Sequence, residues 1–141
     1  MVPGMDRPCV FCAIARGEVP ASFVLRGGDV CAFLDTRPLF KGHVLVVPAE
    51  HVEDLLVLPG RLVEPFWSTV QRIARAVETG LQAQGTMVGV NNKISQSVPH
   101  LHAHVIPRRK GDGLRGFFWP RAKYDSDAER DNYASRIAAA L

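Results

Sequence analysis

The longest periodic segment of the chain runs from Leu62 to Gln84 and has the spacing of an amphipathic helix. Its large apolar residues recur at steps of three and four positions and form one stripe, while the charged and amide side chains mostly fall elsewhere. The stripe consists of Phe66, Val70, Ile73, Val77 and Leu81. We therefore predict one long helix whose apolar side is buried.

Short runs rich in β-branched residues predict the strands, and Gly27–Asp29 between two of them is typical of a hairpin. Three strands precede the long helix and two follow it, without β–α alternation, which favours an α+β fold with a mainly antiparallel five-stranded sheet. The predicted strands are Ser22–Arg26, Val30–Leu34, His43–Val47, Thr86–Val90 and Leu101–Pro107. Further predicted elements are a short helix over Phe11–Gly17, a helical turn within His51–Leu58 and a C-terminal helix over Asp127–Ala140.

The composition is that of one ordinary globular domain, and we expect a single domain over residues 1–141. Hydrophobic residues make up 47% and charged residues 22%, which excludes a disordered or fibrous chain. No apolar run approaches the length of a bilayer span, so we expect no membrane association. The first residues lack the apolar core of a secretory signal peptide, which predicts a cytoplasmic location.

The positive excess behind the net charge of +3 lies in one segment, residues 107–123, because residues 1–106 cancel and residues 124–141 are net acidic. This segment is either a solvated loop or a rim that attracts anionic small molecules. A nucleic-acid groove would need more basic residues along one element, interleaved with stacking aromatics, and this pattern is weak here, so we expect no nucleic-acid partner. The aromatic run Phe117–Trp119 within the segment packs on the core, closes a dimer or borders a ligand site. The basic residues are Arg108, Arg109, Lys110, Arg115, Arg121 and Lys123, and Asp112 is the one acidic residue among them.

Three histidines, His100, His102 and His104, alternate with small or apolar residues from just before the last predicted strand into it. On a strand, side chains at this spacing share one face. One metal ion does not suit all three, because neighbouring same-face residues lie about 6.6 Å apart and the outer pair about 13 Å. We infer separate roles, since a neutral imidazole is a competent nucleophile and an adjacent imidazole can move a proton.

Cys9 and Cys12 form a C-x2-C pair near the N-terminus, which is half of a zinc site. The alternatives are a buried pair of small apolar residues or a redox couple. Two further ligands are available in His51 and His100. The remaining cysteine, Cys31, lies in a predicted strand and is expected in the core.

The segment His100-Leu-His102-Ala-His104-Val-Ile resembles the signature of the histidine triad family, and the resemblance extends over nearly the whole chain. The flanking segments Cys9–Ile14, Ala32–Asp35 and Gly42–Pro48 resemble those of its bacterial members. The resemblance implies a nucleotide hydrolase or transferase that cleaves at an α-phosphate. It also implies a homodimer, with the long helix and the strand Thr86–Val90 near the interface.

The resemblance assigns roles to particular residues. His102 matches the nucleophile that forms a nucleotidyl-histidine, and His104 matches the residue that contacts the phosphate and assists the leaving group. Asp35 matches the carboxylate that holds the ribose, although its local sequence alone favours a turn residue before Pro38. The polar residues matching the phosphate-binding loop are Asn91, Gln96 and Ser97.

The loop Asn91–Gln96 departs from the family pattern, because it is short and contains no glycine. Which of Asn91 and Asn92 faces the phosphate therefore stays open. His43 opens a buried strand and is either a core histidine or a partner of the triad, and we favour the partner.

The resemblance also implies a structural Zn²⁺ held by Cys9, Cys12, His51 and His100, and no organic cofactor. The expected substrates are purine nucleotide conjugates of AMP or GMP: a nucleoside phosphoramidate, an acyl-AMP or a dinucleoside polyphosphate. The basic segment favours the polyphosphate through charge alone. The alternative function is a non-catalytic, zinc-stabilised nucleotide-binding adaptor. A zinc hydrolase is disfavoured, because four protein ligands leave no open coordination position.

Overall fold

The computed structural model describes residues 8–114 and 121–141. The chain divides into two compact units, Met1–Lys110 and Gly111–Leu141, and each is described by itself. Arg115 and the aromatic run Phe117–Trp119 lie outside the described residues, so the roles suggested for them stay predictions. The expectation of a single domain over residues 1–141 likewise stays a prediction.

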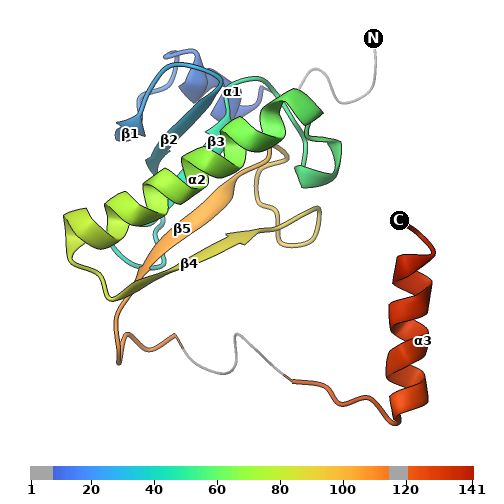
Figure 1. Ribbon diagram of the computed structural model, residues 1–141. Coiled ribbons are helices and arrows are strands. Elements are labelled where there is room, and N and C mark those ends of the chain that lie inside the picture. The colour runs from blue at the N-terminus through green and yellow to red at the C-terminus, as the bar shows by residue number, and fades with distance from the viewer. Residues whose placement is uncertain (1–7, 115–120) are drawn as a thin grey trace. The chain divides into compact units, whose positions relative to one another are not determined.

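The first unit is built on a sheet that has five strands in the described residues, and every neighbouring pair is antiparallel (Figure 1). The strand order β1-β2-β3-β5-β4 leaves β1 and β4 at the edges. This confirms the predicted α+β fold with a mainly antiparallel sheet. The strands are β1 (Phe23–Leu25), β2 (Val30–Leu34), β3 (Val44–Pro48), β4 (Gly85–Val90) and β5 (Ala103–Arg108).

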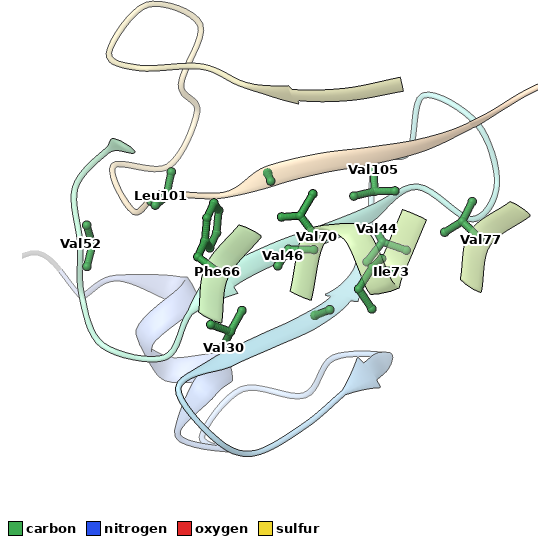
Figure 2. Close-up of a cluster of buried hydrophobic side chains, with 12 residues drawn as sticks. Val30, Val44, Val46, Val52, Phe66, Val70, Ile73, Val77, Leu101 and Val105 are labelled. Carbon is green, nitrogen blue, oxygen red and sulfur yellow. The ribbon is translucent and has the colours of Figure 1, made fainter. Parts of the chain in front are cut away.

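The long helix α2 (Gly60–Leu81) covers one face of this sheet (Figure 1). Phe66, Val70, Ile73 and Val77 of its predicted stripe are buried against alternate residues of the central strands, with Phe66 at 0% exposure, whereas Leu81 at the end of the helix is 43% exposed and that part of the prediction is wrong. Figure 2 shows these side chains meeting between helix and sheet. The sheet contributes Val30, Ala32, Val44, Val46, Ala103 and Val105.

The short helix α1 (Val10–Ala15) belongs to a second apolar cluster, which uses the other set of alternating strand residues. Phe11 and Ile14 of α1 pack with Leu45 and Val47 of β3. Because both of its faces are covered, all of β3 is buried, which explains its continuous apolar sequence.

The long helix ends earlier than predicted, at Leu81 rather than Gln84. Gln82 follows in the left-handed conformation with φ 54°, a position where sequence rules expect glycine. The Arg109 guanidinium donates hydrogen bonds of 2.6 Å to the carbonyl groups of Leu81 and Gln82. Arg109 of the basic segment therefore provides hydrogen-bond donors for carbonyl groups at the C-terminal end of α2 that lack a partner within the helix.

The second unit contains α3 (Asp127–Ala138), as predicted for the C-terminal segment. Ser126 caps its first turn by accepting a hydrogen bond from the Glu129 amide.

A short 3-10 helix, η1 (Leu55–Val57), lies in the first unit within the predicted helical turn. In the described part of the chain, no helix has the length and hydropathy of a membrane span.

Candidate active site and metal centre

The three signature histidines share one side of the backbone, opposite α2, as the alternation predicts. Leu101, Ala103 and Val105 point into the α2 core, whereas the Phe11 ring on the other side packs edge-on against His100 and His102. The hydrogen-bonded strand begins only at Ala103, two residues later than predicted. Only His104 of the three therefore lies in the strand.

His100 is completely buried and has a fixed tautomer. Its Nε2 donates to the carbonyl oxygen of Pro48 at 2.8 Å, which leaves the lone pair on Nδ1. That Nδ1 lies 3.3 Å from the Cys9 Sγ and 3.5 Å from the Cys12 Sγ. Burial lowers the pKa of His100 to about 4, so the imidazole is neutral at physiological pH.

His51 completes a group of four metal-ligating side chains. Its Nδ1 lies 3.4 Å from the Cys12 Sγ, and the four ligand atoms of Cys9, Cys12, His51 and His100 all lie within 4.8 Å of one another. A tetrahedron with Zn–S at 2.3 Å and Zn–N at 2.0 Å separates its ligand atoms by about 3.5 Å. The donor set and spacing therefore fit a closed zinc site.

Without a metal ion, the Cys12 sulfur is held in its neutral thiol form. Burial, followed by the neighbouring Cys9, raises the pKa of the Cys12 thiol to about 11. Two thiolates side by side repel each other, and a divalent cation reverses that effect by stabilising the deprotonated sulfurs.

His102 is held in the opposite tautomer to His100. Its Nδ1 donates to the carbonyl oxygen of His100 at 2.8 Å, so the lone pair lies on Nε2. The side chain is 4% exposed, and its ring centroid lies 5.0 Å from that of His104.

His104 receives its hydrogen bond from another histidine. The Leu39 amide donates to His43 Nδ1 at 3.1 Å, so the proton of a neutral His43 resides on Nε2. His43 Nε2 lies 2.9 Å from His104 Nδ1 and donates to it, which leaves an N–H donor on His104 Nε2. Burial lowers the pKa of His104 to about 4, and burial also lowers the pKa of His43.

Asp35, His43 and His104 form a second group of side chains within ligand distance of one another, but its hydrogen bonds do not suit a cation. A metal on Nε2 of a neutral His43 requires a proton on Nδ1, where the Leu39 amide already points its hydrogen. We interpret His43 and His104 as a hydrogen-bonded pair. Asp35 lies beside this pair, with Oδ2 3.8 Å from His43 Nε2, beyond hydrogen-bond distance, and Oδ1 accepting from the Arg37 amide at 2.9 Å.

The predicted phosphate-loop residues lie together in the connection between β4 and His100. Asn91 and Ser97 are exposed, and Asn91 Nδ2 donates to the Ser95 carbonyl at 3.3 Å. Asn92 instead accepts from the Leu55 amide at 3.0 Å. Because the Asn92 oxygen is engaged by η1, Asn91 is the better placed of the two to face a ligand.

Sequence reasoning missed several groups that organise the site. The tautomers depend on the backbone of Pro48, Leu39 and His100, and backbone groups carry no residue identity that a pattern can reveal. Phe11 was predicted only as part of a helix, although its ring packs against two signature histidines.

Comparison with known proteins agrees with this arrangement. A family model for the HIT domain matches residues 16–111, which include all five described strands and all three signature histidines. The chain belongs to the HIT family. The predicted resemblance to histidine triad proteins is therefore confirmed.

HIT-like relatives match over most of the chain. The protein Rv1262c of Mycobacterium tuberculosis, named an uncharacterized HIT-like protein, is 38% identical over 135 residues, covering 94% of each chain. Two HIT relatives carry names of enzymes. Adenosine 5'-monophosphoramidase HNT1 of Saccharomyces cerevisiae is 30% identical, covering 87% of this chain and 77% of its own. Adenylylsulfatase HINT3 of Arabidopsis thaliana is 36% identical, and the match covers 78% of this chain and 57% of HINT3.

Solved structures share the fold. SMU.412c of Streptococcus mutans superposes with a TM-score of 0.83 at 30% identity, covering 99% of this chain and 88% of the other. A histidine triad family protein of Mycobacterium smegmatis, described as Zn-bound, superposes with a TM-score of 0.71 at 36% identity, and the match covers 94% of this chain and 97% of the other. Its metal is consistent with the Cys/His group of this HIT protein.

Proposed function

We propose that this protein is a nucleotidyl hydrolase or transferase that cleaves nucleotide conjugates at the α-phosphate through a nucleotidyl-histidine. The tautomer of His102 is the observation that carries this proposal. The hydrogen bond from Nδ1 to the His100 carbonyl leaves Nε2 as the ring nitrogen that carries the lone pair.

The chemistry divides into two displacements. His102 Nε2 attacks the α-phosphorus, the bond from phosphorus to the leaving group breaks, and the leaving group departs with a proton. Water then attacks the nucleotidyl-histidine and loses a proton to the neutral His104 ring, the P–N bond breaks, and the nucleotide is released. The ring of the intermediate is cationic, and the His100 carbonyl stabilises it by accepting the Nδ1–H bond.

His104 serves the phosphate and the leaving group. Because its pKa is about 4 in the free protein, it meets the substrate as a neutral Nε2–H donor. An anionic phosphate beside it favours the protonated ring, which is then able to give a proton to the leaving group.

The remaining residues bind the nucleotide in this proposal. Asp35 accepts hydrogen bonds from the ribose hydroxyls, and Asn91, Gln96 and Ser97 belong to the loop that surrounds the phosphates. Backbone N–H groups of the Ser95–Ser97 turn suit a transition state in which negative charge develops.

The group Cys9, Cys12, His51 and His100 holds a structural zinc in this proposal, and no organic cofactor is required. Four protein ligands leave no position for water, so the ion contributes folding energy rather than a nucleophile. His100 is then engaged by the metal, which leaves His102 and His104 for the reaction.

Adenylyl conjugates are the first substrates to test, because HNT1 and HINT3 are named for an AMP phosphoramidate and for adenylyl sulfate. Guanosine conjugates and dinucleoside polyphosphates complete the class. We further propose that the protein acts in the cytoplasm as a homodimer, without nucleic-acid or membrane partners.

The test is a panel of adenosine and guanosine conjugates, followed by one substrate made with a chiral α-thiophosphate. Two in-line displacements predict net retention at phosphorus. His102→Ala is expected to abolish turnover while nucleotide binding persists. Net inversion contradicts a nucleotidyl-histidine, and binding of nucleotides without turnover of any substrate supports the adaptor instead.

A further inference from the structure

The loop that joins β4 to His100 has an unusual backbone. Lys93 and Ser95 both adopt the left-handed conformation, with φ of 71° and 59°. For residues other than glycine this region is disfavoured roughly tenfold. Such conformations persist only where the surrounding structure holds them. Two of them within three residues require a specific restraint.

The Gln96 side chain supplies this restraint. Its Oε1 accepts a hydrogen bond from the Lys93 amide at 2.9 Å, and its Nε2 donates to the Glu53 carbonyl at 2.7 Å. The orientation of the carboxamide follows from these partners, because a flipped group would set N–H against N–H and oxygen against oxygen. One planar group therefore ties the left-handed loop to a segment more than forty residues earlier.

The segment that receives this bond is itself well anchored. His51 belongs to the Cys/His group, and the Val52 carbonyl accepts from the Leu101 amide at 2.7 Å. Asp54 is 4% exposed and caps η1 through the Leu56 amide at 2.9 Å. Gln96 thus fastens the loop to a fixed part of the fold.

We propose that Gln96 is a positioning residue that holds the loop backbone in the form that presents its N–H groups to phosphate. The proposal rests on the proposed function, and it differs from the direct substrate contact that the family resemblance implies for this residue. Both polar atoms of its carboxamide are engaged by the protein, and only one amide hydrogen remains for a ligand.

The principal variant is Gln96→Ala, with Gln71→Ala, at an exposed position on α2, as the matched control. Hydrogen exchange at the Lys93 amide is expected to accelerate in Gln96→Ala and to stay unchanged in the control. The kcat is expected to fall about 10²-fold, the loss typical of a displaced catalytic geometry, with a smaller change in KM.

A rescue experiment separates positioning from contact with substrate. Adding Ser95→Gly to Gln96→Ala is expected to recover roughly tenfold in kcat, because glycine adopts positive φ without the penalty of a side chain. A direct ligand of phosphate is not restored by glycine at a neighbouring position.

Each result decides the proposal. It is overturned if Gln96→Ala leaves the Lys93 amide exchange unchanged, or if it raises KM at constant kcat without rescue by Ser95→Gly. If the unaltered protein turns over none of the nucleotide substrates, the proposed function fails. The exchange rate of the Lys93 amide then decides by itself whether Gln96 holds the loop.

Discussion

His43 offers a sharp perturbation, because each of its two ring nitrogens has a separate partner. Nδ1 accepts from the Leu39 amide, and Nε2 donates to His104. The side chain of asparagine reaches only the position of Nδ1, and that of glutamine reaches the position of Nε2. His43→Asn therefore keeps the bond to Leu39, while His43→Gln keeps the donor to His104.

The magnitudes follow from the single bond that each variant loses. A neutral hydrogen bond contributes about 0.5–1.5 kcal/mol, which changes the ratio of two tautomers by roughly 2- to 13-fold. His43→Asn is thus expected to lower kcat by up to about tenfold, because the Nε2–H form of His104 is no longer favoured. His43→Gln is expected to keep more activity but to lose about 1 kcal/mol of stability, since the Leu39 amide loses its acceptor.

The assay combines kcat on an adenylyl phosphoramidate with thermal unfolding and with ¹⁵N NMR of the histidine rings. His104→Ala serves as the reference variant, because loss of a general acid typically lowers the rate about 10²–10⁴-fold. Equal activity in His43→Asn and His43→Gln would refute the reasoning. A proton found on Nδ1 of His104 in the unaltered protein would do so as well.

Three further outcomes are expected. Metal analysis of the purified protein is expected to give one zinc per chain. Cys9→Ser is expected to lower the Tm markedly and the kcat to a lesser extent, and a native protein that contains no metal would contradict the site. Light scattering is expected to give the mass of a dimer, and Val88→Lys, on the edge strand β4 where Val88 is exposed, is expected to lower this mass toward that of a monomer. A monomer mass for the unaltered protein at micromolar concentration refutes the dimer. The His104 ring stays neutral in an NMR titration down to about pH 4, because a lowered pKa moves protonation to lower pH, and titration near 6.5 contradicts this environment.

Much of the fold follows from the sequence because its periodicities are strong. Val30–Leu34 agrees with the observed strand at both ends, and the stripe from Phe66 to Val77 is buried as predicted. The ends of elements are less predictable. Gln82 terminates α2 in a left-handed conformation that glycine usually supplies, and the Arg109 guanidinium that satisfies those carbonyls lies 27 and 28 residues away in the chain.

The residue types of the candidate site follow from spacing and family resemblance, but their protonation does not. The alternation from His100 to His104 predicts a shared face, and the structure agrees, although the strand begins only at Ala103. The tautomers are set by hydrogen bonds to the main chain, such as that of His100 to Pro48, whose positions appear only once the chain is folded. The contact between Gln96 and Glu53 is hidden for the same reason.

The three signature histidines have similar sequence contexts, and the main chain makes them chemically different. His100 donates from Nε2 and presents Nδ1 to two cysteines, whereas His102 donates from Nδ1 and presents Nε2. The two are joined, because the carbonyl that fixes His102 belongs to His100. A metal bound at His100 therefore restrains the residue that sets the tautomer of His102. In this proposal the metal centre and the nucleophile form one connected unit, so removing the metal is expected to disturb His102, although His102 is not one of the four proposed metal ligands.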